Sequence, residues 1–233
     1  MYTYLLVDLG ALFIPIIASF HPRLKFYNTW AAFFPAMFLT ALPFIIADII
    51  FTRIGIWNFN PRYVMGIYLF SLPLEEYLFF FCIPYACVFT FYCFKILVKR
   101  NVEYSGIRVF NLLLCLILLI IGCIFYKRLY TATTFITLAV VMLFVRRFIP
   151  SFPLGRFFLT YLILIVPFFI CNGILTGTGL AEPVVLYNNA ENLGIRILTL
   201  PIEDIFYGML LILLNTVIYE SVLHKQKADY ANH

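Results

Sequence analysis

The chain has 233 residues, of which 64% are hydrophobic and 12% charged, with a net charge of +5 and a mean hydropathy of +1.00. A soluble domain carries about a quarter charged residues, so this composition excludes a soluble globular protein and indicates an integral membrane protein. No segment alternates polar and apolar residues as the strands of a membrane barrel do. The long apolar segments therefore predict membrane-spanning helices.

An α-helix needs about 20 apolar residues to cross the hydrocarbon core of a bilayer. The sequence therefore predicts an all-α, polytopic helix bundle of about seven transmembrane helices, near residues 3–20, 30–51, 66–94, 107–125, 131–148, 157–176 and 197–222. The third span is long, which predicts a tilt or a kink at Pro73 or Pro84. The first apolar segment lacks a basic leader and a small-residue cleavage site, so we expect a retained span and not a signal peptide.

Basic residues predict the orientation of this bundle. The loops after the odd-numbered spans, together with the C-terminal tail, hold eleven of the sixteen lysines and arginines, Lys99 and Arg100 among them. The positive-inside rule then predicts a multi-pass protein of the cell membrane, with the N-terminus outside and the C-terminus in the cytoplasm. These anchoring residues account for the net charge, so no nucleic-acid partner is expected.

The sequence gives no motif for a metal or a nucleotide cofactor. The six cysteines all lie within apolar segments without CxxC spacing, and the three histidines lie at span edges or in the tail. There is no G-x-G-x-x-G fingerprint and no P-loop. We therefore expect neither a metal site nor a cofactor.

Two stretches of the chain repeat each other. GIYLFSLPLEE (66–76) aligns with GIRILTLPIED (194–204) at an offset of 128, and PFIIADIIFTRIG (43–55) aligns with PFFICNGILTGTG (167–179) at an offset of 124. The repeated spans are four apart, an even number, so both copies run in the same direction and are related by a pseudo-twofold axis along the membrane normal. The predicted organisation is a first repeat (1–104), a linking span (105–128) and a second repeat (129–233).

The repeat places two adjacent acids in each copy, Glu75 with Glu76 and Glu203 with Asp204. An acid at the centre of a membrane helix costs at least about 2.5–3.5 kcal/mol, so we expect these side chains to be functional and to face the protein interior. Counted along the predicted spans, each pair lies about 10–15 Å below the outer boundary. Neighbouring helical residues point about 100° apart, so one acid of each pair is expected to line a cavity and the other to brace a neighbouring helix.

Burial and a like-charged neighbour both disfavour the ionised form of a carboxyl group. A protonated carboxyl in a water-free site can act as a general acid on an apolar substrate. The structural alternative is that the acids only pair with Arg53, Arg62 or Arg196; Arg196 lies two turns before Glu203.

Polar and aromatic residues near the acid pairs are candidates for the wall of a substrate pocket. Asp48 and Asn172 occupy equivalent places in the second and sixth spans and could hydrogen-bond to the acids. Aromatic rings one turn from the acids could stabilise a carbocation through their faces. The predicted pocket residues are Asp48, Trp57, Phe79, Phe80, Asn172, Phe206 and Tyr207.

The motif P-x-E-[ED], present as PLEE at 73–76 and PIED at 201–204, with GIW at 55–57 before the first copy, resembles the membrane-integral lycopene cyclase family in its fused form. The resemblance covers nearly the whole chain. It implies an enzyme of carotenoid biosynthesis, an isomerase that converts the open ψ-ends of lycopene into β-rings, giving γ-carotene and then β-carotene without redox change.

The resemblance also implies that the catalytic acids are Glu75, Glu76, Glu203 and Asp204, and it leaves open which of them donates the proton and which accepts it. It implies a lipid-soluble carotenoid substrate, a membrane lipid environment and no cofactor. The second copy has Ala181 where the first has Trp57, and Asn172 where the first has Asp48. These differences favour one composite site between the halves.

Three other functions fit parts of the sequence. A hydratase of carotenoid end groups would use the same acids but admit water to trap the cation. A small proton-coupled transporter would also explain parallel repeats and membrane acids. A purely structural subunit gives no reason for duplicated acid pairs. A prenyltransferase is disfavoured, because the four aspartates are widely scattered and form no motif for magnesium diphosphate.

Overall fold

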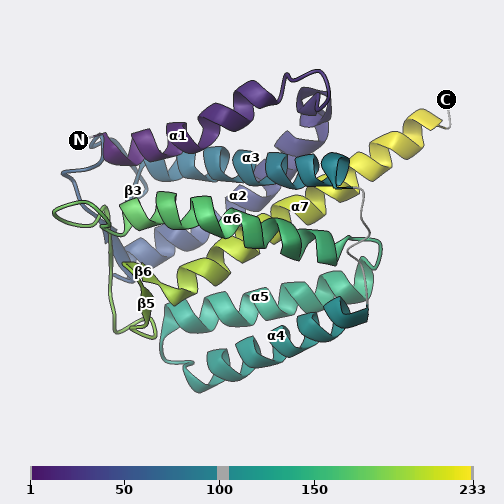
Figure 1. The fold of residues 1–233 in the computed structure, drawn as a ribbon. Helices are drawn as coiled ribbons and strands as arrows, with labels where there is room; N and C mark the ends of the chain where they lie inside the picture. Colours follow the sequence, from purple (N-terminus) through teal and green to yellow (C-terminus); the bar gives the residue numbers. More distant parts are fainter. Residues whose placement is uncertain (1, 99–104, 232–233) are drawn as a thin grey trace.

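The computed structural model describes residues 2–98 and 105–231, so Lys99 and Arg100 lie outside the described residues. The helices within these ranges are α1 (Thr3–Ala18), a 3-10 helix η1 (Phe26–Thr29), α2 (Trp30–Arg53), α3 (Leu74–Leu97), α4 (Ser105–Ile124), α5 (Leu129–Phe148), α6 (Leu154–Leu175) and α7 (Ile202–Ala231) (Figure 1). The six from α2 to α7 are long and apolar enough to cross a membrane, and α1 is apolar but shorter. The predicted all-α membrane bundle is confirmed.

The third and seventh helices begin later than the apolar segments predict. Residues before α3 form the hairpin β2 (Tyr68–Leu69) and β3 (Leu72–Pro73), and those before α7 form the hairpin β5 (Arg196–Ile197) and β6 (Leu200–Pro201). Proline cannot donate a backbone hydrogen bond and disfavours helical conformation in the residue before it, so each helix starts directly after its proline.

The predicted span starts at 66 and 197 are therefore wrong. The same holds for the suggested kink at Pro73, because this residue precedes α3 in an extended conformation with ψ of 153°. Both acid pairs lie in the first turn of their helices. The depth of 10–15 Å predicted for the acid pairs assumes a continuous helix before them, and the structure has no such helix there.

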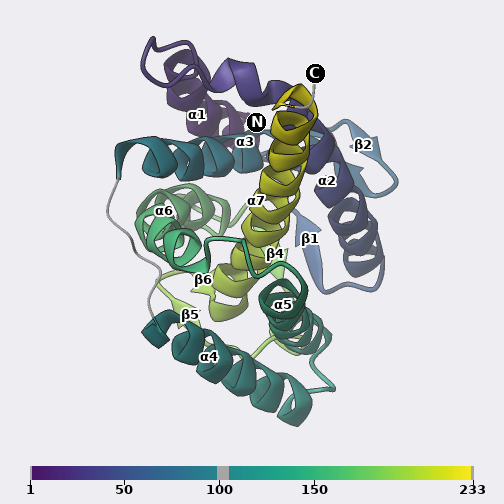
Figure 2. The same ribbon diagram turned by 90° about the vertical axis from the view of Figure 1, so that its right-hand side faces the viewer.

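The two halves have the same order of elements, with α4 between them. One half contains α1, α2, β1 (Trp57–Phe59), β2, β3 and α3, and the other contains α5, α6, β4 (Val185–Tyr187), β5, β6 and α7. The halves interlock, because α2 packs against α7 and α6 packs against α3. Figure 2 shows α7 in the middle of the bundle and α4 at its edge, and 56% of the apolar window of α7 is buried against 22% for α4.

Strands β1 and β4 pair antiparallel and join the halves directly. Asn58 lies opposite Leu186, and Trp57 lies opposite Tyr187. When a twofold axis relates two paired strands, the two residues at the centre of the pairing are equivalent. Here these are Asn58 and Leu186, which are 128 residues apart, so the offset between the repeats is already 128 at these strands. Val185 is therefore equivalent to Trp57, and the predicted equivalence of Ala181 is wrong.

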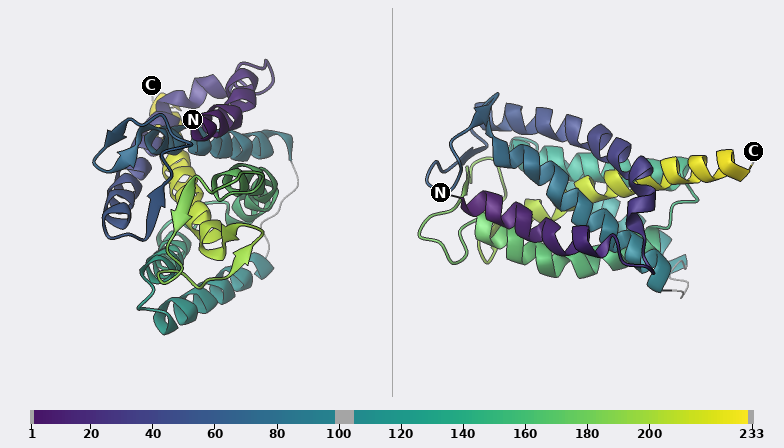
Figure 3. Two further views of the ribbon diagram at one scale, coloured as in Figure 1. Left: turned by 90° about the vertical axis from the view of Figure 1, so that its left-hand side faces the viewer. Right: turned by 90° about the horizontal axis from the view of Figure 1, so that it is seen from above.

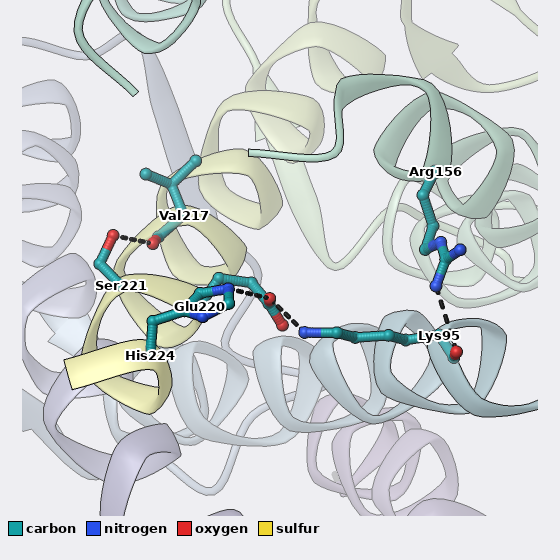
Figure 4. A network of polar contacts seen from close by, with 6 residues as sticks. All are labelled: Lys95, Arg156, Val217, Glu220, Ser221 and His224. Carbon is teal, nitrogen blue, oxygen red and sulfur yellow. Dashed lines mark hydrogen bonds and ion pairs between the residues drawn. The ribbon is translucent and has the colours of Figure 1, made fainter. Parts of the chain in front are cut away.

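The strands and the starts of α3 and α7 gather at the end of the bundle where the N-terminus lies, while the C-terminus lies at the other end (Figures 1 and 3). At that other end the ammonium group of Lys95 on α3 forms an ion pair with Glu220 on α7. The His224 imidazole lies 3.6 Å from the same carboxylate, and Arg156 donates a hydrogen bond to the backbone carbonyl of Lys95 (Figure 4). This network ties the two halves together far from the acid pairs.

Candidate active site

A cavity of about 820 Å³ lies between the two halves. Its wall is mostly apolar and comes mainly from α1, α3, α6 and α7, with two residues each of β1 and β4 and single residues of α2 and α5. The ionisable carboxyl groups in this wall are Asp48 and Glu76 from the first half and Asp204 from the second. Among the described residues that line the cavity there is no lysine and no arginine. A mostly apolar cavity with a few convergent polar groups is the usual form of a small-molecule site.

The first acid of each pair binds the backbone and does not line the cavity. Glu75 accepts a hydrogen bond from the Met65 backbone N–H at 2.6 Å, and Glu203 accepts one from the Leu193 N–H at 2.7 Å, each ten residues earlier in the chain. Glu203 also accepts the Thr131 hydroxyl at 2.6 Å. Both carboxyl groups are fully buried. Glu75 and Glu203 thus hold the hairpins against the starts of α3 and α7.

The second acid of the first pair faces the cavity next to another acid. Glu76 accepts a hydrogen bond from the Tyr4 hydroxyl at 2.6 Å, and its carboxyl group lines the cavity together with the Asp48 carboxyl, which is close enough to interact with it electrostatically. Asp48 accepts a hydrogen bond of 2.5 Å from the Tyr207 hydroxyl, which comes from the second half. Two carboxyl groups and two tyrosine hydroxyls therefore meet at one wall of the cavity.

The second acid of the second pair accepts three hydrogen bonds. Asp204 receives the Tyr130 hydroxyl at 2.6 Å, the Asn172 side-chain amide at 2.9 Å and the Tyr187 hydroxyl at 3.0 Å. Burial and the neighbouring Asp204 carboxyl raise the pKa of Tyr187, so this tyrosine stays a neutral donor. Three donors occupy three of the about four lone-pair sites of a carboxylate and favour its ionised form.

The structure does not support the alternative in which the acids pair with arginines. Within residues 2–98 and 105–231, no ion pair joins a motif acid to Arg53, Arg62 or Arg196. Arg196 instead donates hydrogen bonds to the Thr199 carbonyl at 2.7 Å and to the Asn189 side chain at 2.9 Å.

The aromatic residues predicted for the pocket divide into two groups. Trp57, Phe79 and Tyr207 line the cavity, as do the polar residues Asp48 and Asn172. The Trp57 ring stands edge-on to the Tyr207 ring, with centroids 6.3 Å apart.

The remaining two predicted aromatic residues lie in the core beside the cavity. Phe80 packs on Phe44 with ring centroids 6.0 Å apart, and Phe206 packs on Phe135 at 4.9 Å. Neither ring lines the cavity. Their positions fit a packing role in the apolar core.

Three tyrosines that hydrogen-bond to the cavity acids were missed in the sequence. Tyr4 and Tyr130 are 126 residues apart and hold equivalent acids, Glu76 and Asp204. An alignment of the first span of each repeat at this offset would pair them, but the surrounding residues differ too much to suggest it. Tyr187 lies between the segments that align at offsets of 124 and 128, in a part of the chain that neither alignment covers.

One side of the cavity reaches the outer surface of the bundle. Leu6 and Ile14 on α1 and Ile170 on α6 line the cavity, and 67%, 72% and 60% of their surfaces are exposed. Helices α1 and α6 are in contact, and their outward side chains are apolar, as expected for a surface that faces lipid. The cavity therefore opens between α1 and α6 toward the membrane.

The fold and the cavity define a multi-pass membrane protein with an internal site for an apolar molecule. A comparison with known families matches residues 1–94 and 127–222 to the family described as Lycopene cyclase. The chain belongs to the lycopene cyclase family, so it is an enzyme that cyclises a carotenoid within the membrane. The two matched regions follow the two repeats and leave out α4. No curated protein and no solved structure matched the chain.

Proposed function

We propose that this protein is a lycopene β-cyclase that converts the ψ-end groups of lycopene into β-rings by acid–base catalysis, giving γ-carotene and then β-carotene. The observation that carries the proposal is the position of Glu76 and Asp204. These two acids come from different copies of the P-x-E-[ED] motif and line the same apolar cavity. One composite site then serves both chemical steps.

The reaction needs one proton donor and one proton acceptor. A carboxyl group adds a proton to the terminal double bond, which leaves a tertiary cation. The electron pair of the C5=C6 bond attacks this cation and closes the ring, and a carboxylate removes the proton from C6 to form the ring double bond. The proton count is unchanged overall and no electron leaves the substrate, so the reaction is an isomerisation without redox.

The cavity wall suits a cationic intermediate. Ring faces attract cations, and the rings of Trp57, Phe79 and Tyr207 all line the cavity. Its apolar lining keeps water away, and water would otherwise convert the cation to an alcohol. The opening between α1 and α6 would admit one end of a long hydrocarbon from the bilayer while the rest of the molecule stays in lipid.

We further propose that the protein lies in the cell membrane with its N-terminus outside and its C-terminus in the cytoplasm. This orientation places the strands and the acid pairs near the outer face. Basic residues at the opposite end, including Arg23, Arg146 and Arg147, would lie at the cytoplasmic surface. We also propose the repeat boundaries 1–104, 105–128 and 129–233.

The proposal is tested by expressing the chain in a bacterial host that accumulates lycopene. We expect β-carotene from the intact chain and unchanged lycopene from the Glu76→Gln and Asp204→Asn variants. Glu182→Gln is the matched control, because the Glu182 carboxylate is exposed and lies outside the cavity. The amide oxygen of the glutamine can still accept the hydrogen bond that Asn60 donates to Glu182. We expect β-carotene from this control as well.

Three outcomes would overturn parts of the proposal. Unchanged lycopene from a well-expressed intact chain would refute cyclisation of this substrate. A product that gains the mass of water would identify a hydratase. An ε-ring would show that the base removes its proton from C4 and not from C6.

A further inference from the structure

Three carboxyl groups share the cavity without a basic residue beside them. Asp48, Glu76 and Asp204 are each at least nine-tenths buried, with exposures of 1%, 8% and 4%. No lysine or arginine is found among the described residues of the cavity wall. Ionised groups are costly when they are buried away from water, and like charges close together add to this cost. The arrangement therefore favours a state in which at least one of the three carries a proton.

The two halves differ at the position beside the cavity acids, where the second half has Asn172 and the first has Asp48. Asn172 donates its amide N–H to Asp204, and this hydrogen bond is available to an ionised carboxylate. The equivalent residue beside Glu76 is Asp48, which has no N–H. A carboxyl group can donate to another carboxyl group only when it carries a proton. Asp48 and Glu76 line the same cavity, so a protonated member of this pair could supply the donor that Asn172 supplies to Asp204 in the other half.

We infer that Asp48 and Glu76 share the proton that Glu76 delivers to the substrate, and that Asp204 is the base that removes the ring proton. This inference rests on the proposed cyclase function and assigns the two roles within it. Asp48 is a positioning residue, because it acts through Glu76 by keeping the proton at the cavity wall. Tyr4 and Tyr207 fix the two carboxyl groups by one hydrogen bond each.

The three carboxyl groups together hold the same number of protons before and after one ring forms. Before the reaction, the Asp48–Glu76 pair holds one proton and Asp204 holds none. The pair then gives its proton to the substrate, a C–H bond forms, and both of its members are ionised. Asp204 accepts the proton from the C–H bond that breaks, so the total charge of the three groups is the same before and after. The return of that proton from Asp204 to the pair resets the site.

Infrared spectroscopy of the purified protein in detergent tests the location of the proton without any substrate. A protonated carboxyl group has a carbonyl stretching band that is absent from a carboxylate and shifts in deuterated water. We expect the Asp48→Asn and Glu76→Gln variants to lose the same band, and Asp204→Asn and the control Glu182→Gln to keep it. Loss of the band in Asp204→Asn, with retention in Asp48→Asn, would overturn the assignment.

Activity measurements test the roles separately. We expect Asp48→Asn to lower kcat about 10²-fold or more with little change in KM, because the donor is lost while the substrate still binds. Asp48→Glu should restore part of kcat, since it again provides a carboxyl partner for Glu76. Full activity of a folded Asp48→Asn variant would refute the shared proton while leaving the cyclase function intact. An inactive intact chain would refute the function, and the infrared result would still decide where the proton lies.

Discussion

The Tyr207 hydroxyl on α7 donates a hydrogen bond of 2.5 Å to the Asp48 carboxyl on α2, although 159 residues separate the two in the chain. This contact crosses from the second half to the first, so a side chain of each repeat completes the polar wall contributed by the other. Helices α2 and α7 also pack against each other. The cavity therefore depends on both halves being docked together.

Removal of the Tyr207 hydroxyl should impair the site while the aromatic ring stays in place. Tyr207→Phe keeps the ring that lines the cavity but leaves a buried oxygen of Asp48 without its donor, a loss that typically costs about 1–3 kcal/mol. We expect a lower thermal unfolding temperature and slower cyclisation. Tyr126→Phe is the control, because Tyr126 is 64% exposed and lies outside the cavity. Equal rates and stabilities for the two variants would contradict the proposed importance of this contact.

The two acids of the second pair should respond differently to substitution. Glu203→Ala removes the acceptor for the Leu193 N–H and the Thr131 hydroxyl, so each loses its partner at a cost of about 1–3 kcal/mol. We expect a large loss of folded protein, while Glu203→Gln, which keeps one carbonyl oxygen, should lose less. Asp204→Asn should reduce turnover per folded molecule by about 10²–10⁴-fold.

The measurement for this comparison is carotene formed per amount of folded protein, determined by gel filtration in detergent. A Glu203→Gln variant that folds as well as the intact protein yet is as inactive as Asp204→Asn would contradict this interpretation. Glu203 would then take part in the chemistry and not only in the fold.

Gly208 leaves space in the cavity one helical turn after Asp204. A Cβ atom at this position would lie 3.2 Å from a ring carbon of Phe168 and 3.6 Å from the Tyr161 hydroxyl. Gly208→Ala requires a small shift of Phe168, and Gly208→Leu would fill part of the cavity. We expect KM to rise modestly in the first variant and by about tenfold or more in the second, because overpacking costs about 1–3 kcal/mol.

Val166→Phe provides the comparison, since Val166 is exposed on α6 and does not line the cavity. Substrate titration of the three variants in detergent micelles gives the KM values. A Gly208→Leu variant with unchanged KM would mean that the substrate does not occupy this part of the cavity.

The opening between α1 and α6 should control substrate access. Leu6→Trp and Ile170→Trp add bulk where the cavity meets the lipid, so we expect KM for lycopene to rise, with little change in kcat at saturating substrate. Leu9→Trp is the matched control, because Leu9 is exposed on α1 but lies outside the cavity wall. Equal KM values for Leu6→Trp and Leu9→Trp would show that the substrate uses another route.

The sequence by itself determined the class of this protein. Long apolar segments predict membrane helices because the thickness of the bilayer sets their length, and this reasoning holds without knowledge of packing. The duplicated P-x-E-[ED] motif likewise gave the repeat and the family, since both depend on residues close together in the chain. The acid pairs were therefore found from local pattern alone.

The tertiary structure decided which residues face the cavity. Glu75 and Glu76 are neighbours of nearly the same chemistry, and only the start of α3 after Pro73 turns the first toward the Met65 backbone and the second toward the cavity. The partners of Glu76 and Asp204 are also distant, with Tyr4 72 and Tyr130 74 residues away. A local sequence pattern cannot encode such contacts, because they exist only once the helices of both halves have packed together.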